Sequence, residues 1–341
     1  MGTDRCGDLN LLDAIDVFSG AGGLSLGLHN AGWNVQAAIE FDRNAIQTHE
    51  ENFSSVRHIG EDVRNLCFKQ FRDIDLVAGG PPCQPFSVSG KRLGTFDVRD
   101  MVPEFVRAVS EARPKAFLME NVAGLKAAKF NSYLEARILE LYELGYAVFS
   151  RVLTASDYGV AQNRQRLFLV GIRSDAQQKA FSYPHATHGP LAEIPHITVR
   201  EALEGVPQDT ANNAKVVFCK NPVLRSSPYA GMMFNGKGRP LNYEGLAHTI
   251  PASAGGNRTH ILDPLGVTTT YHAELMAGKK PRIGQLNEVR RLTVRESARL
   301  QSFPDDFKFI GRQSARYSQV GNAVPPKLAA AVAGCIRYAI A

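Results

Sequence analysis

Cysteine and tryptophan are scarce in this chain of 341 residues, which contains five cysteines and one tryptophan. The cysteines are odd in number and lie far apart, at positions 6, 67, 83, 219 and 335, so they predict neither a disulfide framework nor a zinc site. No apolar run approaches the ~20 residues that a membrane helix needs. The first residues, Met1 to Asp8, are polar and show no secretory signal. We therefore expect a metal-free protein of the reducing cytosol, without a membrane association.

Positive charge is in small excess, with a net charge of +6 and a pI near 9.1. A hydrophobic content of 44% and a charged content of 21% exclude a largely disordered chain or a fibre. Between Tyr183 and Tyr317 there are 17 basic and 11 acidic residues, and the rest of the chain is balanced. This stretch is therefore either a solvated basic surface or a lobe that faces a polyanion.

Short apolar strands alternate with helices through residues 13–172, which predicts an α/β fold with a parallel sheet covered on both faces. In such sheets, ligands bind beyond the carboxyl ends of the strands. Glu40, the segment 79–87 and Glu120 each follow a predicted strand directly, so we expect them to converge at one edge. The strands are expected at 13–18, 35–39, 74–78, 116–119, 147–153 and 167–172, and helices at 24–31, 42–52 and 134–141.

After about Phe181, prolines and glycines become frequent and periodicity weakens, which predicts a smaller, irregular domain. A short strand is expected at 215–218. Regular structure is expected again at 290–300, in a helix capped by Thr293 with Glu296 three residues later. A last helix is expected at 327–340, after two prolines.

A glycine-rich turn at residues 19–23 follows the first strand. Such a turn alone could bind a dinucleotide, a nucleoside cofactor or nothing. It departs from the dinucleotide fingerprint because Gly22 and Gly23 are adjacent and no third glycine has the usual offset. Glu40 lies 20 residues after Gly20, where an acidic residue accepts hydrogen bonds from ribose hydroxyls. The combination favours an adenosine-bearing cofactor over a structural turn.

Three further groups of residues indicate a catalytic site at the same edge of the predicted sheet. Cys83 lies among prolines, which stiffen the backbone around the thiol, although a nucleophilic role requires thiolate formation or a coupled protonation of the substrate. Glu120 is placed to act as its acid–base partner. Arg164 and Arg166 are two residues apart on an extended segment, which predicts that both point the same way, toward an anionic or carbonyl-bearing substrate.

Six blocks, in this order, resemble the DNA (cytosine-5)-methyltransferase family, of the compact kind that accompanies restriction enzymes. Together they span nearly the whole chain, and Thr249-Ile250 resembles a threonine–aliphatic pair of the family. The blocks are Asp16–Gly23, Pro81–Ser87, Glu120–Val122, Gln162–Arg166, Arg291–Pro304 and Gln319–Pro326.

The resemblance implies a Rossmann-like sheet and methyl transfer from S-adenosylmethionine to C5 of a cytosine in a specific short duplex DNA sequence. By this resemblance, Cys83 attacks C6, Glu120 holds N3, and Arg166 holds O2 with Arg164 beside it. The same resemblance gives the cofactor-binding residues. They are Phe18, Gly20, Gly22, Gly23, Glu40, Phe41, Asp62, Pro82, Asn322 and Ala323, with Phe41 in place of the usual tryptophan and Ala323 in place of serine.

A cytosine stacked inside a duplex cannot be reached by a side chain, so the base has to be flipped out. The basic, glycine-containing segment 87–100 resembles the family's loop that closes over DNA. The expected domains are 1–181 plus 318–341 for catalysis and cofactor binding, 182–285 for target recognition and 286–317 as a hinge region. The expected DNA-binding residues are Ser87, Lys91, Arg92, Arg99, Lys237, Arg239, Thr249 and Arg258.

The expected partners are double-stranded DNA and a restriction endonuclease that acts on the same site, and the expected form is a monomer in a prokaryotic cytosol or nucleoid. Three alternatives remain. A tRNA cytosine-5 methyltransferase typically differs just after the catalytic cysteine, where Cys83–Ser87 follows the DNA-enzyme form. A catalytically silent DNA-binding module would need a broken catalytic set, and a nicotinamide dehydrogenase is disfavoured by the adjacent glycines.

Overall fold

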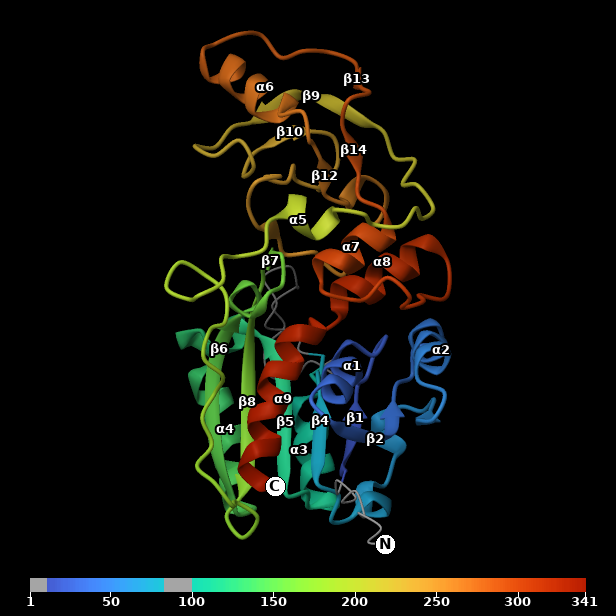
Figure 1. The fold of residues 1–341 in the computed structure, drawn as a ribbon, viewed down its shortest axis with the longest axis vertical. Coiled ribbons are helices and arrows are strands. Elements are labelled where there is room, and N and C mark those ends of the chain that lie inside the picture. Colours follow the sequence, from blue (N-terminus) through green and yellow to red (C-terminus); the bar gives the residue numbers. More distant parts are fainter. Residues whose placement is uncertain (1–10, 83–99) are drawn as a thin grey trace, which may run out of the picture.

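The computed structural model describes residues 11–82 and 100–341. Its lower half in Figure 1 is built around a seven-stranded sheet. The strand order is β3-β2-β1-β4-β5-β8-β6. This is the α/β fold that the alternation of strands and helices predicts. The strands are β1 (Leu12–Val17), β2 (Trp33–Ile39), β3 (Arg57–Ile59), β4 (Leu76–Gly79), β5 (Ala116–Val122), β6 (Tyr146–Thr154) and β8 (Gln165–Arg173).

Strand direction is predicted correctly for most of the sheet and wrongly for β8. Strands β3, β2, β1, β4 and β5 pair in parallel. Strand β8 lies between β5 and β6 and runs antiparallel to both. The connection from β6 to β8, residues 155–164, contains only a 3-10 turn and the short strand β7 (Gln162–Asn163). Parallel neighbours need a crossover connection, usually a helix, that brings the chain back to the edge of the sheet where the first strand began. No such helix lies between β6 and β8, so these two strands run in opposite directions.

Helices cover both faces of the sheet (Figure 1). Helices α1 (Gly23–Asn30) and α9 (Pro326–Ile340) pack on one face, and α3 (Val102–Ala112) and α4 (Asn131–Glu143) pack on the other. Helix α2 (Arg43–Asn52) begins at its N-cap Asp42, whose side chain accepts a hydrogen bond from the Ala45 amide at 2.9 Å. All of these except α3 are predicted from the sequence.

Helix α9, the last of the chain, packs against α1, the first helix, within one hydrophobic core. Gly27 of α1 allows α9 to approach closely, because a Cβ at this position would lie 2.4 Å from the Cβ of Ala329. The Trp33 indole Nε1 donates to the main-chain oxygen of Ala333 at 3.1 Å, so the strand after α1 is also tied to α9. The two ends of the sequence therefore share one hydrophobic core.

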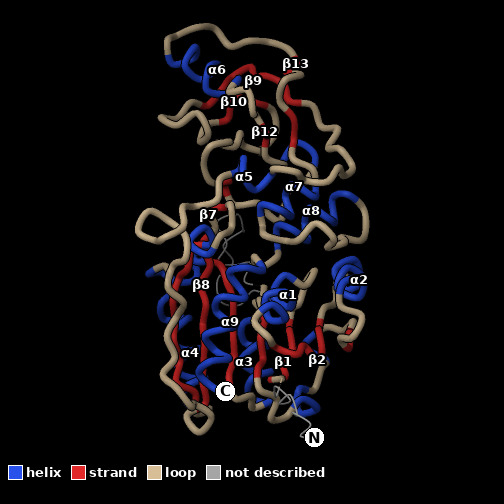
Figure 2. Tube along the Cα trace, in the orientation of Figure 1, coloured by secondary structure: helices blue, strands red, loops and turns tan. Residues whose placement is uncertain are grey.

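The upper half of the molecule is dominated by loops (Figure 2), as the sequence predicts for the region after residue 181. Its small sheets are β9 (Val216–Val223) with β10 (Met232–Phe234) and β13 (Gln285–Leu286), and β12 (Ile261–Leu262) with β14 (Arg290–Arg291). Helices α5 (Val199–Leu203) and α6 (Val267–Met276) accompany them. Strand β11 (Ala247–His248) pairs in parallel with β7 and so joins this half to the lower one.

Two helices, α7 (Val294–Leu300) and α8 (Gln313–Asn322), lie between the two halves (Figure 1). The predicted cap of α7 is confirmed, because the Thr293 side chain and the Glu296 side chain form a capping box. Helix α8, which is not predicted, packs through Tyr317 and Val320 and ends at Asn322. Among the helices of the described residues, none has the length and apolar composition needed to cross a membrane.

Candidate active site

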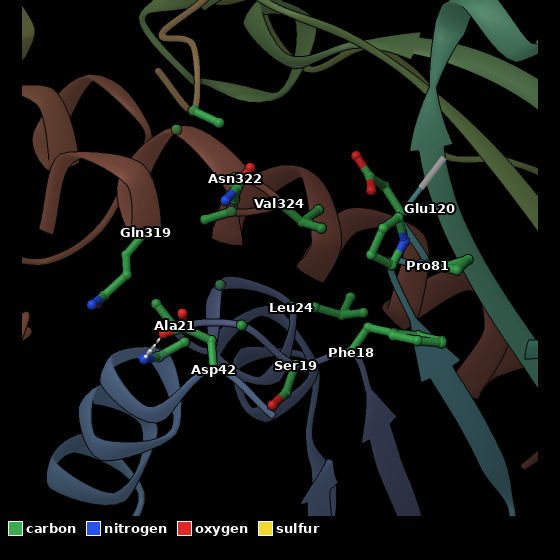
Figure 3. A pocket seen from close by; sticks show the side chains of 18 of the residues that line it. Phe18, Ser19, Ala21, Leu24, Asp42, Pro81, Glu120, Gln319, Asn322 and Val324 are labelled. Atoms are coloured by element: carbon green, nitrogen blue, oxygen red, sulfur yellow. Dashed lines mark hydrogen bonds between the residues drawn. The ribbon is translucent and has the colours of Figure 1, made fainter. Parts of the chain in front are cut away.

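A cavity of about 1080 Å³ opens where the carboxyl ends of β1, β2, β4 and β5 face the C-terminal end of α8. In Figure 3, Glu120 and Pro81 lie on one side of it, Gln319 and Asp42 on the other, and Asn322 between them. Most of the predicted site residues meet here. Those that line it are Phe18, Gly20, Gly23, Glu40, Phe41, Asp62, Pro82, Glu120, Arg164, Arg166, Thr249, Asn322 and Ala323.

Other predicted residues lie elsewhere. Gly22 does not line the cavity, because it faces the C-terminal end of α2, where a Cβ would lie 2.6 Å from Phe53 Cε2 and 3.0 Å from His49 Cδ2. Lys237, Arg239 and Arg258 are exposed in the upper half, away from the cavity. The predictions for Cys83, Ser87, Lys91, Arg92 and Arg99 lie outside the described residues.

The glycine turn leaves open space on the cavity side. Gly20 has a φ of 54°, in the left-handed region, and a Cβ there would meet nothing within 4 Å. Gly23 packs against the C-terminal segment, since a Cβ there would lie 2.4 Å from the main-chain oxygen of Val324. The turn therefore uses one glycine for its conformation beside the cavity and another for contact with the C-terminal segment.

Replacing Gly23 by alanine should lower the free energy of unfolding by about 2 kcal/mol, because the added methyl group meets a main-chain atom that cannot easily move. Gly20→Ala is the matched variant: it has space for the methyl group and carries only the left-handed strain of about 1 kcal/mol. Urea denaturation measures both. Equal losses would show that the contact with Val324 does not limit this position.

Glu40 is held at the end of β2 by three main-chain amides. Its Oε2 accepts from Gly20 at 3.0 Å, and its Oε1 accepts from Phe41 and Asp42 at 2.8 Å each. Burial raises the pKa of this carboxyl group, against the lowering effect of these amides. A carboxylate has about four acceptor positions, so one remains for a ligand.

Phe41 and Asp62 lie beside Glu40 on the cavity wall. The Phe41 side chain is 70% exposed, an unusual state for a large aromatic residue that is consistent with a planar ligand stacking on it. Asp62 pairs with Arg64 at 2.5 Å, and the hydrogen bonds from the Arg64 side chain lower the pKa of Asp62 to about 2. Asp62 is therefore an acceptor at neutral pH.

Glu120 and Arg166 form an ion pair across β5 and β8. Glu120 lies within β5, which extends through Val122, rather than just beyond the strand as predicted. The Arg166 Nε lies 2.7 Å from Glu120 Oε1, and both side chains are largely buried. Burial raises the pKa of Glu120, against the lowering effect of Arg166 and Arg164. The pair thus presents a carboxyl group that retains its proton to a higher pH than an exposed glutamate, next to a cation.

Asn121 fixes the segment that leads to Cys83. Its Nδ2 donates to the main-chain oxygen of Pro81 at 3.1 Å, and a Cβ on the preceding Gly80 would lie 3.3 Å from Glu120 Oε2. Pro82 lines the cavity, and Cys83 is the next residue of the chain. Strand β5 therefore places Glu120 and positions the backbone before Cys83 with two adjacent side chains.

Arg164 has different partners from Arg166, although both line the cavity. It lies in the break between β7 and β8 and is 1% exposed. Its guanidinium group donates to the main-chain oxygens of Ile250, Gly321 and Ala323 at 3.1, 2.9 and 3.1 Å. Arg164 therefore joins the Thr249–Ile250 segment to the end of α8, a role that the two-residue spacing does not predict.

The exposed basic residues of the upper half lie on two loops held in contact. The Lys237 and Gly238 amides donate to the main-chain oxygen of Asn257 at 3.1 and 3.2 Å. Beneath the loops, the buried Arg291 donates to the main-chain oxygens of Asn235 and Thr259. Within the described residues, Lys237, Arg239 and Arg258 form no ion pair, whereas Arg200, Arg290 and Arg299 do.

Sequence reasoning misses several residues of the cavity wall. Pro251, Ala252 and Ser253 line it after Thr249, and Ser318 and Gln319 line it from α8. Gln319 opens one of the six family blocks, but no local pattern marks the other four residues, which reach the cavity only through the pairing of β11 with β7 and the packing of α8.

A sheet of this order, with a glycine turn, an acidic residue after β2 and a cavity at the carboxyl ends of its strands, defines the Rossmann-like class that takes adenosine-bearing cofactors. Comparison with known proteins identifies the family within this class. The family model of the C-5 cytosine-specific DNA methylases matches residues 12–337. The chain therefore belongs to the C-5 cytosine-specific DNA methylase family, and it is a DNA (cytosine-5)-methyltransferase.

Individual relatives agree with this family. Type II methyltransferase M.FnuDI of Fusobacterium nucleatum is 34% identical over 333 residues, which cover 95% of this chain and 93% of the relative. Type II methyltransferase M.NgoPII of Neisseria gonorrhoeae is 34% identical over 341 residues, with 96% of each covered. A crystal structure of an E. coli prophage-encoded DNA modification methyltransferase superposes with a TM-score of 0.67 at 26% identity, covering 96% of this chain and 99% of that one.

Proposed function

We propose that this enzyme methylates C5 of a cytosine flipped out of a specific short sequence of duplex DNA, through a covalent bond between Cys83 and C6. The observation that carries the proposal is the cavity shared by Glu40, the Glu120–Arg166 pair and Pro82, next to which Cys83 follows in the chain. One wall suits a nucleoside cofactor and the other a neutral, carbonyl-bearing base.

The cytosine ring needs activation because C5 is a poor nucleophile. Addition of the Cys83 thiolate at C6 breaks the aromatic system and leaves an enamine whose C5 can attack a methyl group. Glu120, with its raised pKa, donates a hydrogen bond or proton to N3 as the thiolate adds. Arg166 stabilises the charge that develops on O2. A base such as water then takes the C5 proton, the C5–C6 double bond re-forms, and the C6–S bond breaks to release the Cys83 thiolate.

S-adenosylmethionine supplies the electrophilic methyl group when bound, and the residues present fit it. The open space at Gly20, the free acceptor position of Glu40 and the exposed ring of Phe41 lie on one wall. We propose that Glu40 binds the ribose hydroxyls, Asp62 the adenine amino group and Phe41 the adenine face. Phe18, Gly20, Gly23, Pro82, Asn322 and Ala323 would surround the rest, with Gly22 shaping the turn behind them.

Phe41→Ala should weaken S-adenosylmethionine binding about 3- to 10-fold, since an aromatic stacking contact contributes about 0.5–1.5 kcal/mol. Phe41→Trp restores the larger ring of the family and should bind at least as tightly as the wild type. Isothermal titration calorimetry measures both affinities.

The control for loss of an exposed aromatic ring is Tyr142→Ala. Tyr142 is 68% exposed on α4 and does not line the cavity, so its removal should leave the affinity unchanged. Equal affinities of the Phe41→Ala variant and the wild type would show that the adenine does not stack on Phe41.

We propose that residues 1–181 plus 318–341 form the catalytic and cofactor-binding domain, 182–285 the target-recognition domain and 286–317 the hinge region. The exposed loops with Lys237, Arg239 and Arg258 are the proposed base- and phosphate-contacting surface, and Thr249 contacts DNA at the cavity. From the segment outside the described residues, Ser87, Lys91, Arg92 and Arg99 are proposed to contact the duplex as well.

The relatives' names, Type II methyltransferases, support a protective role. We propose that methylation by this enzyme, acting as a monomer, protects DNA from a restriction endonuclease that cuts the same sequence. Bisulfite sequencing of DNA from an expressing host identifies the methylated cytosine and its sequence context.

The decisive experiment combines transfer of a labelled methyl group to duplex DNA with trapping on a duplex that contains 5-fluorocytosine. The fluorine cannot leave as a proton does, so the covalent complex should persist and migrate as one species on a denaturing gel. A protein that forms no adduct on any duplex containing 5-fluorocytosine would contradict the proposal. Methylation of tRNA in preference to duplex DNA would instead identify an RNA substrate.

A further inference from the structure

A buried histidine of the upper half connects two of the proposed DNA-contacting segments. His260 is 7% exposed. Its Nδ1 accepts a hydrogen bond from the Arg239 main-chain amide at 3.2 Å, and its Nε2 donates to the main-chain oxygen of Thr249 at 3.2 Å. One ring therefore bridges the exposed loop of Arg239 and the segment that lines the cavity.

On the loop side, the contacts continue along the backbone. The Ile261 amide donates to the main-chain oxygen of Arg239 at 2.9 Å, so the Arg239 loop lies alongside the segment that carries His260. A Cβ on Gly238 would lie 1.8 Å from the main-chain oxygen of Thr259, which shows how closely the two segments pack. The Arg239 backbone is thus fixed to the His260 segment while its side chain is exposed.

On the cavity side, the contacts continue to β7 and Arg164, which directly precede the strand that carries Arg166. Thr249 Oγ1 donates to the main-chain oxygen of Asn163 at 3.0 Å, and the Ile250 amide donates to Gln162 Oε1 at 3.0 Å. Arg164 binds the main-chain oxygen of Ile250. Two residues later in the chain, Arg166 pairs with Glu120.

The two bonds of His260 require a single neutral tautomer. A main-chain amide can only donate, so Nδ1 must be unprotonated, and a main-chain oxygen can only accept, so Nε2 must carry the proton. Burial lowers the pKa of His260 to about 4, which keeps the ring neutral at physiological pH. Both bonds therefore persist throughout the neutral range.

We propose that His260 is a positioning residue that couples recognition of the DNA sequence to the geometry of the cytosine-binding wall. By holding the Arg239 loop and Thr249 in a fixed relation, it ensures that a duplex which seats the loop correctly also brings Thr249 against the flipped cytosine. This inference rests on the proposed function and adds a residue for which the sequence carries no signal.

Two substitutions separate the two bonds. His260→Asn places an amide oxygen near the position of Nδ1 and retains the acceptor for Arg239, whereas His260→Gln places an amide nitrogen near the position of Nε2 and retains the donor to Thr249. The readouts are the single-turnover rate on the cognate duplex and its ratio to the rate on duplexes with one changed base pair. His272→Gln is the matched control, since His272 is another buried histidine of the upper half and binds the main-chain oxygen of Arg225.

For His260→Gln, the expected result is a cognate rate within about 3-fold of the wild type and a discrimination ratio lowered about 10-fold, as for one lost buried hydrogen bond. For His260→Asn, the expected result is a cognate rate lowered about 10-fold with the discrimination ratio retained. S-adenosylmethionine affinity should not change in either variant. His272→Gln should lower thermal stability and change neither rate nor discrimination.

Equal changes of rate and discrimination in both His260 variants, or no change in either, would overturn the coupling and leave His260 a core residue. If a variant does not fold, amide hydrogen exchange of the wild type gives the answer. Cognate duplex should protect the Arg239 and Ile250 amides together, and protection of one without the other contradicts the inference. A wild type that does not methylate duplex DNA fails earlier and removes the proposed function itself.

Discussion

Cys83→Ser is expected to lower methyl transfer by about 10⁴-fold or more, the size of effect seen when an enzyme loses its nucleophile. The thiolate is the attacking species, and a few per cent of an ordinary thiol is ionised at neutral pH. A serine hydroxyl ionises far less readily and would need a general base beside it. The variant should also form no adduct with 5-fluorocytosine duplex.

The matched control is Cys67→Ser, because Cys67 is an exposed free cysteine that does not line the cavity. It should retain methyl transfer within about 2-fold, as surface substitutions generally do. Calorimetry with S-adenosylmethionine should give the same affinity for both variants and the wild type. Substantial methyl transfer by Cys83→Ser would exclude the covalent route, whereas loss of cofactor binding would show that the substitution disturbs the fold.

Local patterns predict the part of the site that is local in sequence. The strand, glycine turn and helix that place Gly20, and the second strand that ends at Glu40, follow from apolar spacing and turn chemistry over a short stretch of chain. The cap at Thr293 is predicted for the same reason, since its partner Glu296 is three residues away. These contacts depend little on the rest of the fold.

The sequence predictions are wrong or incomplete where contacts join residues that are far apart in the chain. The apolar run of β8 shows that the strand is buried but carries no information on its direction, which depends on the helix-free connection before it. Arg164 and Arg166 look equivalent by spacing, yet one binds main-chain oxygens of three distant residues and the other binds Glu120. Polar contacts of this kind have no periodicity, so sequence patterns do not identify them.

Glu120 offers the second large effect, because its environment separates its role as a proton donor from its role as an ionic partner. Burial raises its pKa, so the protonated form persists to a higher pH than in an exposed glutamate. If protonated Glu120 assists attack at C6, the rate should fall as pH rises through this raised pKa. Formation of the Cys83 thiolate gives the opposite trend, and the wild-type profile should therefore be bell-shaped.

Glu120→Gln should lower the single-turnover rate about 10²- to 10³-fold, since it keeps a hydrogen-bonding side chain but removes the transferable proton. It should also abolish the alkaline fall of the profile, so that the rate only rises with pH as the thiolate forms. Adduct with 5-fluorocytosine duplex should still form, more slowly. Glu120→Asp keeps the carboxyl group but withdraws it from its 2.7 Å contact with Arg166, and should retain an alkaline fall at a reduced rate. An unchanged alkaline fall in Glu120→Gln would assign that limb to another group and leave Glu120 an ionic partner of Arg166.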